Sequence, residues 1–490
     1  MVSSSENSSD NDADSAEPQT FEEAISSTMV GRFHYFHLFI AGMCAMSMMV
    51  EVSCLSLVMS AAKCDLNFTV YQQGLLGSSG FIGVAIGCQV LGFLADSLGR
   101  VKTLRIMLGI SICSSLISAF SVNFQMLMVF RVFTGFFISG CQSCVFSYVA
   151  EFHGSKSRVK YITMTAVFLP IGGVYFPGRI AIGVLPLSLE SFSPWRLYLI
   201  LNILPSIIAC GGLFLLPESP KYLLSQGKPD ECLKVLRQIF SVNTGKSKNL
   251  YPCSKLETLE FQRSQIGLKL IKDKFKVLFS KNIYLQTLNL CFVAFGITFV
   301  GTGTYMWLPV IISFLLSNSE TSSTVCEAIT SSQAGNSTIS SCEGPVNTLQ
   351  YEILLYIGVF FVCSYFFISQ IITLVGKKRL FVCWLGVNAV SSIVIYWIHN
   401  IYASMVALTI VVAIGNTNSI LNAIAADYFP TDVNAMALSI ILMSCKVGAV
   451  VGTNVFGSIL LQYCNQFFFV IGGFIVLLLG LVFLLPGNKR

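Results

Sequence analysis

The stretch AMSMMVEVSCLSLVM, from Ala45 to Met59, places one carboxylate, Glu51, inside an otherwise apolar and small-residue run. The whole chain has the same character, because 54% of its 490 residues are hydrophobic and only 11% are charged, against roughly 25% charged in soluble domains. So few charges cannot cover a soluble surface of this size. The sequence therefore predicts an integral membrane protein, with the stretch around Glu51 in its first membrane-spanning helix.

Twelve apolar runs are long enough to cross a bilayer as helices, which takes about 20 residues each. They are expected at 35–60, 74–95, 103–122, 124–149, 161–187, 196–216, 284–316, 351–375, 379–398, 401–426, 434–462 and 466–485. Six precede and six follow a long polar segment, so we predict an all-α membrane protein with twelve transmembrane helices in two six-helix halves. Similar span ends, GGLFLLPESPK from Gly211 and GLVFLLPGNK from Gly480, indicate a duplicated unit. Two such halves around a central cavity are a known transporter architecture.

The predicted domains follow from these spans. They are a disordered acidic cytoplasmic tail at 1–33, an N-terminal six-helix bundle at 34–216, a cytoplasmic basic linker at 217–282, and a C-terminal six-helix bundle at 283–486 with an outside loop at 317–350. The tail is rich in Ser, Asn and Asp and lacks the apolar segment of a signal peptide. Basic residues gather in the loops after even-numbered spans, with thirteen of them between Pro217 and Lys281. The positive-inside rule therefore predicts both termini in the cytoplasm, with the chain in the plasma membrane or a vesicle membrane.

Features of the loops after odd-numbered spans suit the non-cytoplasmic side. Glycosylation sequons stand at Asn67 and Asn336, so both are expected glycosylation sites. Cys326 and Cys342 share one loop in an oxidising compartment and are expected to form a disulfide. The alternatives are two unpaired thiols, or pairing elsewhere, for example with Cys64. The remaining cysteines and the four histidines lack the spacing of a metal site, so we expect no metal and no cofactor.

Three motifs resemble signatures of the major facilitator superfamily. GFLADSLGRVK (Gly92–Lys102) resembles the loop signature after span two, RVFTGFFISG (Arg131–Gly140) resembles the R-x-x-x-G pattern of span four, and PESPKYLL (Pro217–Leu224) resembles the signature after span six in sugar and organic-ion transporters. YVAEF at 148–152 and IGGVYFPG at 171–178 are similar to the branch of the synaptic vesicle glycoprotein 2 proteins, beside the organic-ion transporters. The resemblance covers about residues 30–486 and implies the major facilitator fold.

The resemblance also implies a cytoplasmic latch that holds the outward-facing state of a transporter. Its residues in this chain are Gly92, Asp96, Gly99, Arg100, Glu151 and Asp427. The alternative interpretation of the loop is a plain structural turn. In the second half, the loop after span eight reads VGKKRL and has no aspartate. We therefore expect the second latch to be degenerate.

Charged residues inside spans are costly and should face the interior of the bundle. The candidates for substrate binding or coupling are Glu51, Arg131, Arg179, Lys446 and, more weakly, Tyr175. Arg131 is the first partner to test for Glu51. For these two residues, proton or substrate coupling and a purely structural pairing both remain open. Arg179 and Lys446 could also extend toward the membrane surface or pair structurally.

The excess of cations inside the spans predicts a negatively charged or zwitterionic cargo. In the organic-ion relatives, a basic residue at the position of Lys446 goes with anionic substrates. We therefore expect a secondary active or facilitative transporter of a small organic solute, leaning to an organic anion or zwitterion, that works by alternating access. Its partners would be the lipid bilayer, the solute, and protons or other ions.

Two glycine-containing runs predict how single spans are shaped and packed. The run GTGTYMWLP at 301–309 predicts a kink or break in span seven. The motif GVAIG at 83–87 is expected to seat span two against a neighbouring helix of the same chain.

The alternative function is a non-transporting, synaptic-vesicle-glycoprotein-like membrane protein that acts in vesicle trafficking or as a receptor. It is favoured by Met48, because relatives often carry an aspartate at this position of span one. The sequence contains no nucleophile elbow, nucleotide-binding motif or basic polar domain, so we expect neither an enzyme nor a nucleic-acid-binding protein. We expect a monomer.

Overall fold

The computed structural model describes residues 19–67, 69–187, 192–257, 280, 284–317, 324–334, 348–429 and 431–485. In this part of the chain, twelve helical segments are long and apolar enough to cross a membrane, and they match the twelve predicted spans. The predicted class, an all-α membrane protein with two six-helix halves, is therefore confirmed.

The first half contains spans one to six. Its helices are α2 (Arg32–Ser53), α3 (Leu55–Ala61), α4 (Lys63–Leu66), α5 (Val70–Leu98), α6 (Arg100–Ala119), α7 (Phe124–Glu151), α8 (Ser155–Ala166), α9 (Phe168–Pro170), the π-helix η1 (Ile171–Tyr175), α10 (Phe176–Val184), α11 (Pro194–Asn202) and α12 (Leu204–Leu213). Span one is α2 with α3, and span five runs from α8 through η1 to α10.

The second half contains spans seven to twelve. Its helices are α16 (Tyr284–Ser317), α17 (Val325–Ala334), α18 (Thr348–Val375), α19 (Lys377–Val394), the 3₁₀-helix η3 (Ile395–Trp397), α20 (Ile401–Val412), the 3₁₀-helix η4 (Ala413–Asn416), α21 (Thr417–Tyr428), α22 (Thr431–Gln462) and α23 (Cys464–Phe483). The predicted break in span seven is wrong, because α16 runs unbroken through Pro309, whereas a kink there stays a prediction. The π- and 3₁₀-helical segments of the described spans lie in spans five, nine and ten.

A small module outside the bundle joins the two halves. It consists of α1 (Phe21–Ser26), α13 (Pro220–Ser225), α14 (Pro229–Thr244) and the 3₁₀-helix η2 (Lys248–Leu250). The helices α1, α13 and α14 share a hydrophobic core that includes Ile25, Leu236 and Phe240. Residues 19–33 were expected to be disordered, but α1 packs into this core and Gln19 forms a β-bridge with Leu256. The tail prediction is therefore corrected for these residues; residues 1–18 lie outside the described part.

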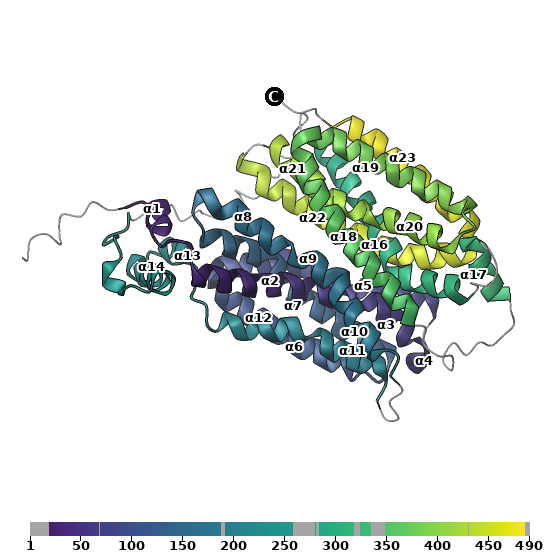
Figure 1. Cartoon of the computed structure of the whole chain (residues 1–490), viewed down its shortest axis with the longest axis horizontal. Helices are drawn as coiled ribbons and strands as arrows, with labels where there is room; N and C mark the ends of the chain where they lie inside the picture. The colour runs from purple at the N-terminus through teal and green to yellow at the C-terminus, as the bar shows by residue number, and fades with distance from the viewer. Residues whose placement is uncertain are drawn as a thin grey trace, which may run out of the picture.

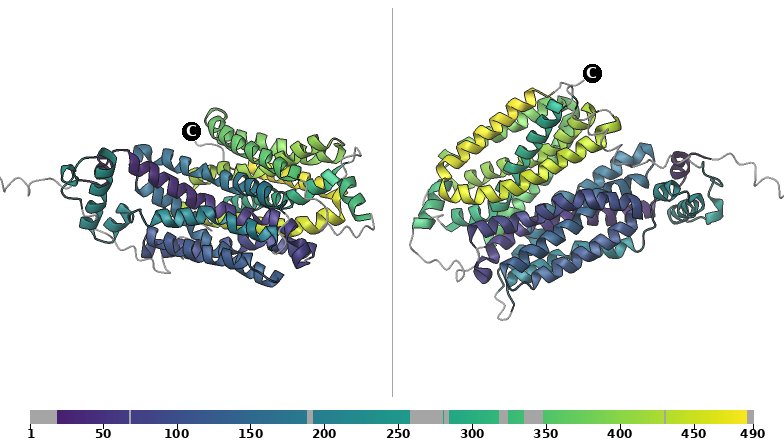
Figure 2. Two further views of the ribbon diagram at one scale, coloured as in Figure 1. Left: turned by 60° about the horizontal axis from the view of Figure 1, so that its bottom comes forward. Right: turned by 180° about the vertical axis from the view of Figure 1, so that it is seen from behind.

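The two halves meet at one end and diverge at the other (Figures 1 and 2). We call the end that carries the linker module the linker end, and the opposite end, near α4 and α17, the loop end. One hydrophobic cluster runs through the second half and continues into the loop end of the first half, where it includes Leu55 and Trp195. The linker end of the first half has a separate cluster around Tyr148 and Phe152. Among the described residues, the apolar core is thus continuous between the halves only at the loop end.

Local sequence signals explain where the main helices begin. Thr69 and Gln72 form a capping box at the start of α5, and Asn123 accepts a hydrogen bond from the backbone of Met126 at the start of α7. Close helix contacts follow small residues: a Cβ at Gly83 of α5 would meet the Val132 carbonyl oxygen of α7 at 2.1 Å. The GVAIG motif therefore seats span two against span four of the same chain.

Candidate functional site

A buried ion pair joins spans one and four. Nη1 of Arg131, on α7, lies 2.9 Å from Oε2 of Glu51, on α2. The two side chains are only 1% and 2% exposed. A single buried charge at this depth would lose its hydration without gaining a partner. The attraction between the two charges offsets this cost for both residues. The structure thus brings together the two residues whose pairing the sequence suggested.

Two serine hydroxyls of α6 complete the surroundings of this pair. Ser115 Oγ donates to Glu51 Oε2 at 2.9 Å, and Arg131 Nη2 donates to Ser118 Oγ at 2.6 Å and to Ser115 Oγ at 3.3 Å. Sequence reasoning missed both serines, because serine in a spanning helix usually bonds its own backbone. The available signal was a row of serines in one predicted span, at 111, 114, 115, 118 and 121.

The GFLADSLGRVK and PESPKYLL motifs meet at the linker end of the first half. Glu218 accepts hydrogen bonds from the backbone N–H groups of Val101 and Lys102, at 3.0 and 3.3 Å. Its carboxylate therefore caps the N-terminus of α6, where the helix dipole favours an anion. Gly99 has a φ of 104°, and a Cβ there would meet Glu218 Oε2 at 2.7 Å. Glycine is required at 99 both for its backbone conformation and for the approach of this carboxylate.

The other predicted latch residues divide into two groups. Arg100 forms a half-buried ion pair with Glu151, at 3.3 Å between Nη2 and Oε1. This contact ties the start of α6 to the end of α7. Gly92 and Asp96 lie on the last turns of α5, but the Asp96 side chain falls outside the described residues. A role of Asp96 in a latch stays a prediction.

The second half repeats this arrangement in a reduced form. Gly376 begins α19 with a φ of 91°, as Gly99 begins α6. Lys377 Nζ lies 2.5 Å from Oδ2 of Asp427, which is itself 62% exposed. Asp427 is therefore in an ion pair at the position equivalent to Glu151, although the contact is far more open to solvent.

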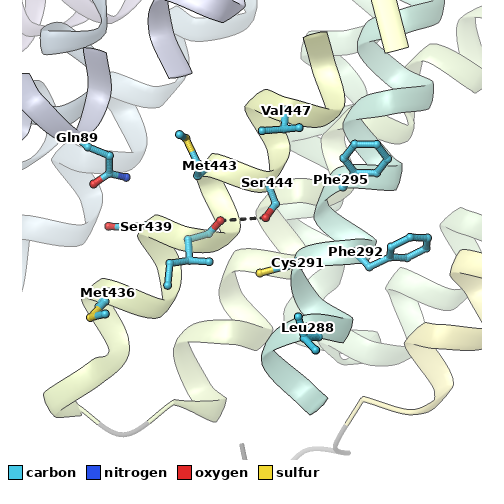
Figure 3. A pocket seen from close by; sticks show the side chains of 11 residues that line it. Gln89, Leu288, Cys291, Phe292, Phe295, Met436, Ser439, Met443, Ser444 and Val447 are labelled. Atoms are coloured by element: carbon cyan, nitrogen blue, oxygen red, sulfur yellow. Dashed lines mark hydrogen bonds between the residues drawn. The ribbon is translucent and has the colours of Figure 1, made fainter. Parts of the chain in front are cut away.

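A cavity of about 810 Å³ lies between the halves, toward the linker end (Figure 3). Its apolar lining includes Phe292 and Phe295 of α16 and Met443 of α22, and Gln89 of α5 faces them from the other half. None of the five predicted substrate or coupling residues lines it. Lys446 is one residue from the lining, on α22, and is half-buried.

The halves touch directly at the loop end. Asn454 Nδ2 on α22 donates to Ser78 Oγ on α5 at 2.9 Å, and Tyr305 on α16 donates its hydroxyl to the Gly173 carbonyl at 2.7 Å. Gly173 belongs to the π-helix η1, a type of irregularity that often accompanies functional sites. Tyr175 ends this π-helix and is 45% exposed. Arg179 is exposed on α10. Neither residue lies at the ion pair.

The predicted disulfide is wrong. Cys326 of α17 forms a disulfide with Cys464, at the start of α23, with 5.5 Å between their Cα atoms. Since a cysteine forms one disulfide, it cannot also pair with Cys342, which lies outside the described residues. Asn67 is exposed at the end of α4, with a φ of 46°. Asn336 lies outside the described residues, and glycosylation at both sequons stays a prediction.

Asn243 of the linker module binds the backbone just before and at the start of span one. No sequence pattern indicated this contact. Its Nδ2 donates to the carbonyls of Thr28 and Met29, at 3.1 and 2.7 Å, and its Oδ1 accepts the N–H of Phe33 at 3.0 Å. The same Nδ2 lies 3.1 Å from Nδ1 of His34. One amide thus fastens α14 to the beginning of α2.

Two titratable groups lie where the turn between α7 and α8 meets its neighbours: Glu22 bonds Ser155 and Arg158, and His153 contacts His34. Burial would raise the pKa of Glu22, but hydrogen bonds from the Arg158 side chain and the Ser155 backbone lower it overall. His153 is buried in the turn between α7 and α8, and burial lowers the pKa of its ring to about 4 despite a hydrogen bond to the Val149 carbonyl. Its ring stacks on Tyr161 and lies 4.9 Å from that of His34. His153 is therefore neutral at pH 7.

The curated relatives include synaptic vesicle glycoproteins. The chain is 28% identical to human synaptic vesicle glycoprotein 2B over 58% of its own length and 46% of that protein, and 28% identical to the mouse 2C protein over 61% of its length and 45% of that protein. The chain thus spans about half the length of the curated relatives it matches.

Solved structures share the fold. The partially occluded inward-open xylose transporter XylE from E. coli covers 93% of this chain and all of its own, with a TM-score of 0.69 and 14% identity. The nucleoside transporter NupG matches with a TM-score of 0.64 and 11% identity. Family models for "Sugar (and other) transporter" and "Major Facilitator Superfamily" match residues 24–315 and 346–490. The chain therefore belongs to the sugar and other transporter family of the major facilitator superfamily, and it has the major facilitator fold.

Proposed function

We propose that the protein carries a small organic solute across a membrane by alternating access. The observation that carries this proposal is the asymmetry between the two ends of the bundle. The halves are joined at the loop end by the Asn454–Ser78 and Tyr305–Gly173 hydrogen bonds, and they are separated by a cavity toward the linker end. Such an arrangement is what one of two alternating states requires, because the pathway is closed on one side and open on the other.

We propose an organic anion or zwitterion as the solute. Lys446 supports this, because it lies at the boundary between the halves and forms no ion pair with any described residue. The Glu51–Arg131 pair is proposed as the coupling site for protons, because protonation of the Glu51 carboxylate beside Arg131 would add one positive charge to the interior of the first half. We expect no enzymatic activity.

We further propose that the linker end faces the cytoplasm, in the plasma membrane or a vesicle membrane. The basic loops and the linker module lie at this end, as the positive-inside rule requires. The exposed Asn67 sequon lies at the other end, where glycosylation is possible.

The test is uptake by purified protein in liposomes. Vesicles with and without the protein are incubated with a metabolite extract, and their contents are compared without choosing a solute beforehand. A negatively charged or zwitterionic compound should accumulate only with the protein. Lys446→Glu should reduce its uptake at least about tenfold, and the matched variant Lys446→Arg should retain most of it. Absence of any accumulated compound, under every ion gradient, would instead support the non-transporting alternative.

A further inference from the structure

The serines of α6 and of the turn that follows it do not all behave alike. Ser114 donates to the Phe130 carbonyl at 2.9 Å and Ser121 donates to the Ser118 carbonyl at 2.8 Å, so both bond the backbone. Ser115 instead donates to the Glu51 carboxylate. Ser118 donates to the Ser115 carbonyl at 2.6 Å, which leaves its oxygen free to accept Arg131 Nη2. Two of these four hydroxyls, those of Ser115 and Ser118, thus bind the Glu51–Arg131 ion pair.

Glu51 and the two serine hydroxyls bind different nitrogens of the Arg131 guanidinium. Nη1 is bound by Glu51 Oε2, whereas Nη2 is bound by Ser118 and, at 3.3 Å, by Ser115. A carboxylate that held both nitrogens would use both of its oxygens. Here only Oε2 is engaged, and Glu51 Oε1 has no hydrogen-bond partner among the described residues. The serines therefore keep one carboxylate oxygen unoccupied while the guanidinium stays fixed.

We propose that Ser115 and Ser118 are positioning residues that hold Arg131 in place when Glu51 changes its protonation state. This inference rests on the proposed function, because it assigns the coupling pair a third element, α6. A proton delivered by a hydronium ion would form an O–H bond at Oε1 and leave a water molecule behind. The carboxyl would then be neutral, and Ser118 and Ser115 would remain as the partners of the Arg131 cation. Arg131 would not have to leave its site during the cycle.

Few other ionisable groups surround Glu51. Among the described residues, the charged or titratable side chains that act on it are Arg131 from α7 and the thiol of Cys54, between α2 and α3. If a pH-dependent signal changes when Ser118 is substituted but not when Ser114 is, it can therefore be assigned to the Glu51–Arg131 pair.

The test compares Ser118→Ala and Ser115→Ala with Ser114→Ala, a matched control on the same helix, and with Ser118→Thr, which keeps a hydroxyl. The first measurement is the thermal unfolding midpoint from pH 5 to pH 8, which needs no solute. A merely structural role lowers the midpoint by the same amount at every pH. The proposal predicts that the offset for Ser118→Ala and Ser115→Ala changes with pH by about 2 °C or more, while Ser114→Ala and Ser118→Thr follow the wild type.

The second measurement is the pH profile of solute uptake. Ser118→Ala and Ser115→Ala should shift it by about half a pH unit or more, and Ser118→Thr should restore it. Identical pH profiles for Ser118→Ala and Ser114→Ala in unfolding would overturn the inference. If the wild-type protein takes up nothing, but Ser118→Ala and Ser115→Ala still show the pH-dependent offset from it, the transport function is overturned and the positioning role of the serines is left intact.

Discussion

The two halves of the bundle are built on one plan but carry different amounts of charge in their interiors. In the first half, Gly99 starts α6 against the Glu218 carboxylate, and a buried ion pair lies deeper in the bundle. In the second half, Gly376 starts α19 with open space where a Cβ would stand, and the Lys377–Asp427 pair, the counterpart of Arg100–Glu151, is more exposed. Among the described residues of the second half, no buried ion pair is found. The PESPK segment of the first half reads PGNK at the end of the second, so the capping carboxylate has no counterpart in the sequence. Polar contacts that are expensive to bury are thus concentrated in one half.

The largest expected effect is the loss of one member of the buried pair. Arg131→Leu leaves the Glu51 carboxylate without its counter-ion, and should cost about 3–5 kcal/mol of stability. Adding Glu51→Leu should recover most of this loss, because no isolated charge remains. Thermal unfolding of the single and double variants in detergent checks the prediction. If the double variant were as unstable as Arg131→Leu alone, the pair would not be the reason for the loss.

Acid should weaken the first half before the second. The unfolded chain binds a proton at His153 near pH 6.5, whereas the folded protein does so only at about 4. Stability is therefore unchanged above pH 6.5 and falls as the pH drops toward 4, by at most about 3 kcal/mol.

Hydrogen exchange measured at pH 7 and pH 5 gives the readout for this acid effect. Peptides around the α7–α8 turn and the start of α2 should lose protection, and those of α19 and α23 should keep it. His153→Phe, which can still stack on Tyr161, should abolish the difference. Equal loss of protection in both halves would contradict the assignment to His153.

The two glycines at the helix starts give a matched comparison. Both have positive φ, so either Gly→Ala change should cost about 1 kcal/mol for the backbone conformation. Gly99→Ala also forces the Cβ against Glu218, so its cost should be at least about twice that of Gly376→Ala. Thermal unfolding measures both variants, and Gly99→Ala combined with Glu218→Gly, which removes the clash, serves as the control. Equal costs for the two single variants would mean that the Glu218 contact is not formed.

The smallest expected effect is the difference in coupling energy between the two ion pairs at the linker end. A double-mutant cycle on Arg100 and Glu151, which are half-buried, should give a coupling of about 1 kcal/mol. The same cycle on Lys377 and Asp427 should give less than about 0.5 kcal/mol, because solvent screens the exposed carboxylate. A stronger coupling between Lys377 and Asp427 than between Arg100 and Glu151 would contradict this account of solvent screening.

Features that depend on composition and on the cost of burying charge could be predicted from the sequence. The twelve spans and the pairing of Glu51 with Arg131 follow from the lack of hydration inside a membrane, and both are found. Contacts between distant segments could not be predicted: Glu218 lies 117 residues from Val101, and many cysteines could have paired with Cys326. The expected kink or break in span seven rested on two glycines and Pro309 in the run 301–309, but neither residue type needs to end a helix in a packed bundle, where neighbouring groups satisfy the freed backbone.

Ser115 and Ser118 could not be predicted as site residues from the sequence for a different reason. Their residue type is consistent with ordinary self-bonding in a helix, and only the approach of α2 and α7 gives them a charged partner. The same holds for Asn243, whose four contacts all lie on a segment more than two hundred residues away.

Alternating access requires the loop-end contact between the halves to open before the solute can cross. Cysteines introduced together at Ser78 and Asn454 would stand where a hydrogen bond of 2.9 Å now joins the halves. Uptake by liposomes containing this variant should stop when a short reducible thiol reagent bridges the two positions, and should return on reduction. Each single-cysteine variant, given the same reagent, should keep its uptake. Continued uptake through the bridged protein would contradict alternating access between these halves.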